Sequence, residues 1–528
     1  MATYSTQAII EGIQRHGWLR GINVGGYLRT ESGVGAGARG YVRALRSLGV
    51  PVALKDVSEL CINRSGDRAL TDFDTDHPYD VNLVCIDVEL HFAVIAHLGE
   101  EFFRDRYNIG VWWWELPQFP QKWYDRFAYY DEIWVGTSFI ANVLAPIAPI
   151  PIVRIPPVLT AGTCGSRDSG RRRLGVSPDE LVYLFVFDVH STLERKNPLA
   201  LIDAFKTAFV PSDPVRLVIK CVNDGSDPEG SAAMAARAQG YPISIHKGYW
   251  TAEEMRNLMA ACDAYVSLHR SEGAGLTITD AMAQGKPVIA TGWSGNMDFM
   301  NVSNSFPVRY ELVELKESVG PYQAGQAWAE PSVEHAAELM RRVFAHREEA
   351  RARGQAARRE IETHYSEEKV ASLIQRRLEA IAIRRQFSLF REEMRAHFRR
   401  YQQLPERMRE VVRIALPPDA TVIVVSKGDN ELLELDGRTA WHFPQGADGA
   451  YAGYYPANST EAIARLEALR AKGADFLLFP STALWWLEYY GEFKQHLERR
   501  YRVVVCQEDA CVIFRLCEPG TGACNKAG

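Results

Sequence analysis

The sequence predicts an α/β protein with two parallel-sheet domains and a smaller third α/β domain. Short apolar runs rich in Val, Ile and aromatic residues alternate with helical segments, which is typical of βαβ units. The alternation stops after Pro156 and Pro157 and restarts at Leu181, so it describes two successive domains of similar size. The length of 528 residues fits about three domains of roughly 150 residues each.

In the first domain we expect six strands, at residues 20–27, 52–57, 81–86, 109–114, 132–136 and 152–155, with helices at 37–47 and 138–144. A Gly-, Ser- and Arg-rich stretch, 161–175, is predicted to be a linker. In the second domain we expect strands at 181–187, 215–221, 243–247, 264–269 and 287–291, and helices at 197–209, 231–239, 252–261 and 276–284.

The remaining sequence changes character twice. From residue 333 it becomes helical and basic, with 19 Lys and Arg against 11 Asp and Glu over 341–413. Strands are then expected at 421–425, 476–479, 502–505 and 511–515, with helices at 460–472 and 483–500. The predicted domains are therefore 1–160, 175–365, a basic helical connector at 366–415, and a small C-terminal domain at 416–528.

Composition excludes several classes of protein. The net charge of −6, from 60 basic and 66 acidic residues, argues against a nucleic-acid binder. We expect a cytoplasmic protein without a membrane span, because no basic and apolar leader opens the sequence and no run of 18 apolar residues occurs. The basic segment 341–413 leaves open a peripheral contact with anionic lipid at the inner membrane face, although its interleaved acids favour a solvated helix.

The nine cysteines indicate reduced thiols rather than a disulfide framework. Four of them, Cys61, Cys85, Cys221 and Cys262, lie in apolar runs, where a thiol behaves as a small hydrophobe. Four more, at positions 506, 511, 517 and 524, are spaced more widely than the Cys-x2-Cys pairs of zinc ribbons. We therefore expect core or incidental cysteines there and no metal site.

A glycine-rich turn, Gly33, Gly35 and Gly37, follows the first predicted strand and opens a helix. Such glycines let a backbone approach a ligand, and the helix start favours an anion. Tight packing of the first βα corner explains the same pattern equally well. A dinucleotide fingerprint is not indicated, because no acidic residue clearly ends the second strand.

Two cations, Arg195 and Lys196, follow the first strand of the second domain and precede a helix whose first turn carries Pro198. Ligands of open α/β sheets gather at these strand ends, and paired cations beside a helix start suit a diphosphate. The same residues would also be unremarkable as a surface salt-bridge pair.

The segment 269–290 runs from a strand through a Gly-x-Gly turn into a helix and another strand. Glu272 is expected in the turn and Asp280 about two turns along the helix, so both acids can face one crevice. A carboxylate can accept two hydrogen bonds from vicinal sugar hydroxyls, while the N–H groups of the turn can meet phosphate. The alternative is an exposed acid at a helix start together with a solvated Asp.

These residues resemble the Glu-x7-Glu signature of retaining family 4 glycosyltransferases, which have the GT-B fold. The segment 291–298, the Arg195–Lys196 stretch and the Gly33–Gly37 loop are similar to further parts of that family, so the resemblance covers roughly residues 20–385. One departure is that the second acid is Asp280, one methylene shorter than Glu. The implied fold is two Rossmann-like, doubly wound domains that close over a donor in their cleft.

The resemblance also implies roles for single residues. Arg195 and Lys196 would neutralise the leaving nucleoside diphosphate, Glu272 would contact the transferred sugar, and Asp280 would hold the donor ribose. The donor would also meet the turn and helix-start residues Gly35, Gly273, Gly275, Leu276 and Thr277. Transfer would proceed with retention, without a metal and with no cofactor beyond the nucleotide-sugar donor.

Three further features are weighed for the site. His91, after the third predicted strand, is the candidate for a family histidine near the donor, although a lone His in an apolar context is more often structural. The tryptophans at 112–114 form either an acceptor platform or core. Asp72, Asp74 and Asp76 have the Asp-x-Asp spacing of metal-dependent GT-A enzymes, but they precede a strand and better fit a solvated loop.

The expected function is transfer of a sugar from a nucleotide sugar to a glycan or lipid-linked glycan acceptor, in surface polysaccharide or glycoconjugate synthesis. Two alternatives stay open at this point. One is another GT-B sugar-nucleotide or sugar-phosphate enzyme, such as an epimerase or phosphorylase, and the other is a non-catalytic glycan-binding scaffold. The tryptophans at 485–486 in the last domain are ambiguous between core and carbohydrate or partner contact.

Overall fold

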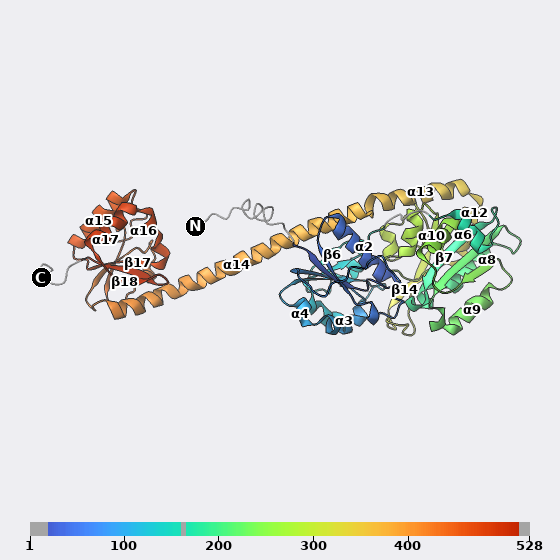
Figure 1. The fold of residues 1–528 in the computed structure, drawn as a ribbon, viewed down its shortest axis with the longest axis horizontal. Coiled ribbons are helices and arrows are strands. Elements are labelled where there is room, and N and C mark those ends of the chain that lie inside the picture. The colour runs from blue at the N-terminus through green and yellow to red at the C-terminus, as the bar shows by residue number, and fades with distance from the viewer. Residues whose placement is uncertain (1–19, 160–164, 517–528) are drawn as a thin grey trace. The chain divides into compact units, whose positions relative to one another are not determined.

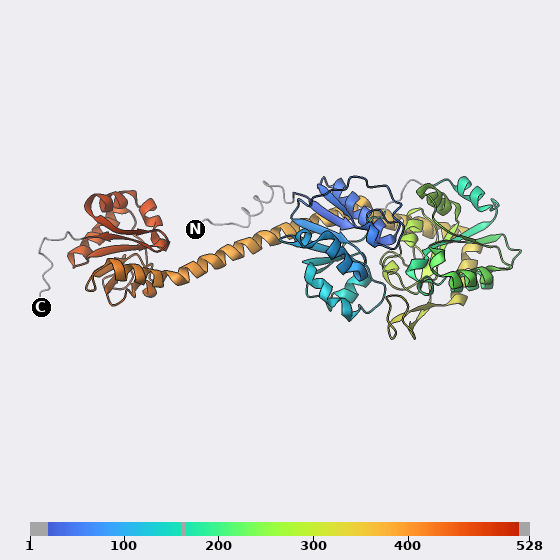
Figure 2. The same ribbon diagram turned by 60° about the horizontal axis from the view of Figure 1, so that its bottom comes forward.

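A computed structural model describes residues 20–159 and 165–516 of the chain. The chain divides into two compact units, residues 1–383 and 384–528. Unit 1 holds two parallel sheets and unit 2 holds a third, mixed sheet (Figures 1 and 2). The predicted α/β class, with two Rossmann-like domains and a smaller C-terminal sheet, is confirmed.

The first sheet has six parallel strands in the order β2-β1-β3-β4-β5-β6. The strands are β1 (Ile22–Gly26), β2 (Val52–Asp56), β3 (Val81–Cys85), β4 (Tyr107–Trp112), β5 (Glu132–Val135) and β6 (Ile152–Arg154). All six lie where the apolar runs predict them. Because β1 pairs with both β2 and β3, the strand order reverses beside β1, and the loops after β1 and β3 flank a ligand-binding crevice.

Helices cover both faces of this sheet: α2 (Gly33–Ser47), α3 (His91–Leu98), α4 (Glu100–Phe103) and α5 (Ser138–Leu144), with 3₁₀ turns η1 (Ser58–Leu60), η2 (Val88–Leu90) and η3 (Gln121–Tyr129). Helix α2 begins four residues before its predicted start, since Ser32 caps it by accepting a hydrogen bond from the Gly35 N–H at 3.2 Å. The glycines of the predicted turn therefore form the first turn of α2.

The second sheet has the order β12-β11-β10-β7-β8-β9, again all parallel. Its strands are β7 (Leu181–Asp188), β8 (Val215–Val222), β9 (Ile243–His246), β10 (Ala264–Ser267), β11 (Val288–Thr291) and β12 (Phe306–Val308). The helices around it are α8 (Pro198–Ala208), α9 (Pro228–Ala238), α10 (Ala252–Ala261), α11 (Leu276–Ala283), α12 (Val333–Ala345) and α13 (Arg347–His364). The strand order reverses between β7 and β10.

The predicted linker at 161–175 is wrong over most of its described part. Residues 160–164 lie outside the described residues, but helix α6 (Arg167–Leu174) follows them and packs beside α10. Ser166 caps its N-terminus, and Gly175 ends it in the left-handed conformation, at φ 63°. Arg171 is buried there and donates to the carbonyl of Glu180 at 2.7 Å. The polar composition of this segment therefore concealed a helix whose buried Arg171 donates to backbone carbonyls.

An antiparallel hairpin that the sequence did not predict follows β12. It consists of β13 (Tyr310–Glu314) and β14 (Ala327–Pro331). Its loop carries Tyr322, which is 4% exposed and packs with the aromatic core of the first domain. The hairpin therefore extends from the second domain to the first.

Helix α14 (Glu367–Ala415) begins in unit 1 and ends in unit 2. Its first turns return to the first sheet, where Val370, Ile374 and Leu378 are buried in the core that also holds Trp134 (Figure 1). Arg377 pairs with the fully buried Glu132. The start of the connector is therefore part of the first domain's core.

Unit 2 has a five-stranded sheet in the order β16-β15-β17-β19-β18. The strands are β15 (Thr421–Val424), β16 (Thr439–His442), β17 (Phe476–Pro480), β18 (Arg502–Gln507) and β19 (Cys511–Arg515). Helices α15 (Ser459–Ala471), α16 (Trp485–Tyr489) and α17 (Gly491–Arg500) cover one face, and the last turns of α14 cover the other (Figure 1).

The single helix predicted at 483–500 is wrong, since the chain breaks between α16 and α17. The break falls at Tyr490 and Gly491. Tyr490 is buried, and its hydroxyl donates to the carbonyl of Pro456 at 2.7 Å. This anchor holds the Tyr490 backbone outside helical geometry, and the following glycine is a weak helix former.

Candidate active site

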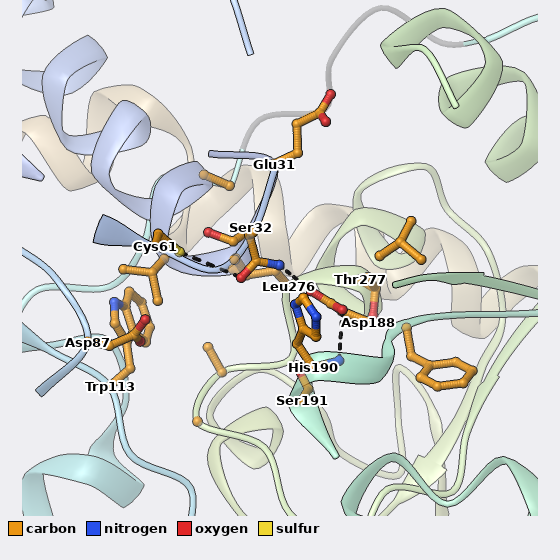
Figure 3. A pocket seen from close by; sticks show the side chains of 18 of the residues that line it. Glu31, Ser32, Cys61, Asp87, Trp113, Asp188, His190, Ser191, Leu276 and Thr277 are labelled. Carbon is orange, nitrogen blue, oxygen red and sulfur yellow. Dashed lines mark hydrogen bonds between the residues drawn. The ribbon is translucent and has the colours of Figure 1, made fainter. Parts of the chain in front are cut away.

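A cavity of about 920 Å³ lies between the carboxyl edges of the two parallel sheets. Its walls come from the loops after β1, β2, β3 and β4 on one side, and from the ends of β7 and β8 and the loops after β7, β9 and β10 on the other. Figure 3 shows side chains of the first domain, such as Asp87 and Trp113, opposite Asp188 and Thr277 of the second. The volume is in the range of small-molecule sites.

The second domain places two cations at the cavity. Arg195 and Lys196 are the last residues of a short helix, α7 (Leu193–Lys196). Asn197 follows in the left-handed conformation, at φ 54°, and separates α7 from α8. Arg195 is 4% exposed, and its Nη1 donates to the carbonyl of Ser271 at 2.8 Å. The guanidinium is therefore held rigidly beside the turn that follows β10.

Glu272 lies between these cations. Lys196 Nζ donates to Glu272 Oε1, and Arg195 Nη1 lies 3.5 Å from Oε2. Burial alone would raise the pKa of Glu272, but the two cations outweigh it and lower the pKa to about 2. The sequence-predicted Arg195, Lys196 and Glu272 thus form one buried ionic cluster, and Glu272 is ionised at neutral pH.

The segment after β11 supports the Glu272 turn from behind. The Ser294 hydroxyl accepts a hydrogen bond from the Glu272 N–H at 2.9 Å, and the Gly295 N–H donates to the Glu272 carbonyl at 2.9 Å. A Cβ on Gly295 would lie 2.0 Å from the carbonyl oxygen of Gly273, so only glycine fits. The backbone on which Glu272 sits is therefore rigid.

The turn then enters helix α11. Gly275 caps the helix at φ 82°, the first N–H groups of a helix have no partner within it, and Leu276 and Thr277 line the cavity. Thr277 is further fixed by the Tyr265 hydroxyl, 2.7 Å from its Oγ1. This helix start is a ready anion site.

Asp280 lies one turn further along α11 and also lines the cavity. Its carboxylate is exposed to the cavity, while the surrounding protein raises its pKa to about 6 by desolvation. Gly273, Gly275, Leu276 and Thr277 line the cavity beside it.

Gly35 and His91 do not line the cavity. A Cβ on Gly35 would lie 2.4 Å from Thr30 Oγ1, so the glycine is needed to pack the first corner. His91 is fully buried, with its Nδ1 3.2 Å from the Tyr130 hydroxyl and its ring against Phe92 and Tyr129. Burial lowers the pKa of His91 to about 4. We therefore give neither residue a role at the cavity.

The first domain supplies acids and aromatics that the motifs did not single out. Asp87 follows β3 at the reversal of strand order and lines the cavity. Burial raises its pKa to about 7, and the nearby carboxylates of Glu115 and Glu89 add to this effect. The rule that ligands gather at strand ends beside such a reversal would have found Asp87 from the sequence.

The tryptophans at 112–114 divide between core and cavity. Trp112 is fully buried, Trp114 is 3% exposed but lines the cavity, and Trp113 lines it with a partly exposed ring. Strand β4 ends at Trp112, which releases the next two residues into the loop.

Tyr322 is a cavity residue for which the sequence held no signal. Its hydroxyl donates to Glu115 Oε2 at 3.0 Å, and the Arg195 guanidinium lies 5.9 Å from its ring centre. The unpredicted hairpin thereby places an aromatic ring between the acidic wall and the buried cations.

A polar bridge crosses the cavity rim. Asn63 of the first domain donates through Nδ2 to Asp188 Oδ2 at 2.6 Å. Asn223 donates to the other oxygen of Asp188 at 2.8 Å and accepts from the Tyr249 hydroxyl at 3.0 Å. Figure 3 labels Asp188, the acceptor of this bond. The two domains are thus hydrogen-bonded at this rim.

Within residues 20–159 and 165–516, no group of three or more His, Cys, Asp or Glu side chains is placed to hold a metal ion. The acidic loop engages protein groups instead: Asp72 pairs with Arg46, and Asp74 accepts from the Leu54 N–H at 2.8 Å. In the same described part, no helix combines the length and apolar character needed to cross a membrane.

Comparison with known proteins places this site in context. Residues 167–304 match the sequence model of the family described as glycosyl transferases group 1. The chain has the GT-B fold. The matched segment carries Arg195, Lys196, Glu272 and Asp280, so the similarity lies in the half that holds the cations.

Solved structures agree on the fold. Sucrose-phosphate synthase from Thermosynechococcus elongatus is 14% identical, with a TM-score of 0.52 over 71% of this chain and 100% of that chain. A glycosyltransferase from Rickettsia africae is 14% identical, with a TM-score of 0.51 over 69% and 98%. Anabaena HepE in complex with UDP-glucose is also 14% identical, with a TM-score of 0.50 over 68% and 99%. None of the curated proteins compared with this chain matches it significantly.

Proposed function

We propose that this protein is a retaining glycosyltransferase that moves a sugar from a nucleoside-diphosphate sugar to a glycan or lipid-linked glycan acceptor. The observation that carries the proposal is the buried Arg195–Lys196–Glu272 cluster at the strand reversal of the second sheet. It lies within the segment that matches the glycosyltransferase family. Synthesis of a surface polysaccharide or glycoconjugate fits such an acceptor.

The cluster supports this chemistry because it can exchange partners. When a donor enters, its diphosphate competes with Glu272 for Arg195 and Lys196, which both pair with this carboxylate. The cations then stabilise the negative charge that develops on the departing diphosphate. Glu272 is released toward the sugar, where an ionised carboxylate stabilises the oxocarbenium-like transition state.

The other residues take positioning roles in this proposal. The helix start at Leu276 and Thr277 binds a phosphate oxygen, and Asp280 accepts from the ribose hydroxyls. The cations do the work that a divalent ion would do, so the proposal requires no metal and no cofactor beyond the donor. The acidic and aromatic wall, with Asp87, Trp113 and Glu115, faces the acceptor.

The test begins with a thermal-shift and calorimetric screen of UDP-, GDP- and dTDP-sugars against the full-length protein. UDP-glucose is the first probe, because HepE was solved with it. Hydrolysis or transfer of a bound donor, followed by proton NMR of the new linkage, then reports the anomeric configuration. We expect the Glu272→Gln variant to retain donor binding and to lose sugar transfer.

The same screen separates the competing functions. Release of nucleotide without dependence on an acceptor would indicate an epimerase or another sugar-phosphate enzyme. If none of the nucleotide sugars binds, the function that remains is that of a glycan-binding scaffold. An inverted linkage would refute retention but leave transfer intact.

A further inference from the structure

Unit 2 carries a group of aromatic side chains that the proposed chemistry does not use. We call it the aromatic surface; it comprises Tyr451, Tyr455, Trp485 and Tyr489, with Lys427 beside them. Tyr489 is 70% exposed and Tyr455 is 41% exposed. Trp486 and Tyr490, the sequence neighbours of Trp485 and Tyr489, are buried in the core. In each adjacent pair, one aromatic ring therefore packs in the core and the other lies at the surface.

Contacts join these residues into one group. The Trp485 ring centre lies 5.4 Å from that of Tyr455 and 5.9 Å from that of Tyr489, in both cases edge to face. Lys427 Nζ lies 5.6 Å from the Trp485 ring centre. Tyr451 packs against Gly428, where a Cβ would lie 3.0 Å from its ring.

The aromatic surface lies at the ligand-binding edge of its sheet. Strand β15 pairs in parallel with β16 on one side and β17 on the other, so the strand order reverses at β15. Lys427 follows the end of β15 and donates to the carbonyl of Thr482, just after β17, at 2.9 Å. This is the position at which open α/β sheets bind small molecules.

The polar atoms of these rings are available to a ligand. Among the described residues, the hydroxyls of Tyr451, Tyr455 and Tyr489 and the indole N–H of Trp485 have no hydrogen-bond partner within the protein. The buried Tyr490 hydroxyl, by contrast, is bonded to Pro456. Apolar ring faces combined with free donors suit a ligand that is apolar on its faces and hydroxylated at its rim.

Charge narrows the class of ligand. Residues 416–516, which follow helix α14 and carry the aromatic surface, hold 14 acidic and 10 basic side chains, so this part of unit 2 does not attract a polyanion. Nucleic acids and anionic lipid surfaces are bound by clustered positive charge, which is absent from this described segment. A neutral glycan does not need clustered positive charge in its binding site.

We propose that the aromatic surface is a second, non-catalytic carbohydrate-binding site that holds a neutral glycan chain on Trp485 and Tyr489. The pyranose C–H faces lie on the rings, while sugar hydroxyls pair with the phenol and indole donors. Only the identification of this glycan as the acceptor rests on the proposed function, in which case the site holds the growing chain apart from the reacting end.

The experiment titrates the full-length protein with maltohexaose, cellohexaose, chitohexaose and laminarihexaose, followed by calorimetry and by quenching of tryptophan fluorescence. We expect at least one hexasaccharide to bind. Tyr489→Ala should weaken binding about threefold, and Trp485→Ala with Tyr489→Ala should weaken it more than tenfold. Tyr310→Ala, an exposed tyrosine of unit 1, is the matched control and should bind as the wild type does.

Two comparisons keep the result decisive. Glu272→Gln should bind the hexasaccharide unchanged, so loss of transfer and loss of glycan binding are separate outcomes. Tyr489 is mostly exposed, so its single variant tests the site even where the double variant misfolds. The proposal is overturned if no hexasaccharide binds, if the variants bind as tightly as the wild type, or if poly(U) or phosphatidylglycerol vesicles bind through these residues instead.

Discussion

The two parallel-sheet domains each have six strands whose order reverses at the first strand, but they present different charges to the cavity between them. Among the described lining residues, the first domain contributes five carboxylates and Arg39, whereas the second contributes three cations and three carboxylates. Arg39 is committed to the backbone, because it donates to the Thr30 carbonyl at 2.8 Å. The two cations that pair with Glu272, Arg195 and Lys196, both belong to the second domain.

This difference assigns the two walls to different partners. In the proposed function, a diphosphate binds beside Arg195 and Lys196, while carboxylates such as Asp87 and Glu115 accept hydrogen bonds from hydroxyl groups. Both sheets present the carboxyl ends of their strands to the cavity. In the proposed function, the side chains of the loops distinguish the donor wall, which is the second-domain side with Arg195 and Lys196, from the acceptor wall, which is the first-domain side with Asp87 and Glu115. Variants on each wall should therefore have different kinetic effects.

The largest effect is expected on the donor wall. Arg195→Ala or Lys196→Ala should lower transfer by roughly 100- to 1000-fold, because each removes charge stabilisation of the leaving diphosphate. The measurement is kcat/KM with saturating acceptor. Arg216→Ala, whose side chain pairs with Glu180 away from the cavity, is the control and should retain activity. Full activity in folded Arg195→Ala protein would refute the assignment of the donor wall.

On the acceptor wall, Asp87→Asn should lower transfer roughly thirtyfold at pH 8, since it removes a charged hydrogen-bond acceptor. The pKa of Asp87 is about 7, so the wild-type carboxylate is protonated below pH 7 and its activity should rise as pH increases through that value. The variant should lack this rise. Asp125→Asn, an exposed acid outside the cavity, should keep the wild-type profile.

A smaller effect is expected at Asp280. Asp280→Asn should raise the donor KM roughly tenfold at pH 8, where the wild-type carboxylate is ionised and accepts two hydrogen bonds. With a pKa of about 6, the wild-type residue loses this charge as pH falls below 6, so the two proteins should converge near pH 5. A constant difference between them from pH 5 to pH 8 would show that Asp280 acts through packing alone.

The smallest effect concerns the rim that joins the two walls. Asn63→Ala removes the hydrogen bond to Asp188 that joins the two domains at the rim. It should raise the donor KM roughly threefold with little change in kcat, because fewer molecules have the two domains closed on each other before the donor binds. Asn63→Asp places two carboxylates together and should have the larger effect. Equal KM values for all three proteins would mean that this bond does not stabilise the closed arrangement.

Hydrophobic periodicity and turn residues predicted those helices and strands that short-range sequence patterns specify. Most strands of the two parallel sheets appear where apolar runs indicate them, because burial on both faces of a parallel sheet demands such runs. Glu272 and Asp280 could be grouped because one turn and one helix carry both. Helix α6 was missed because its polar, arginine-rich composition resembles that of a linker, and its stabilising carbonyl contacts to Arg171 are not local features.

The sequence by itself determined the α/β class, the places of most strands along the chain and the residue types that follow them, since these depend on periodicity and turn chemistry. The tertiary structure decided which of those residues meet. Lys196 reaches Glu272 across 76 positions, and Tyr322 reaches Glu115 across 207. It also turned His91 away into the core and left Trp485 at the surface. Such pairings depend on strand order and domain contact, which no local spacing encodes.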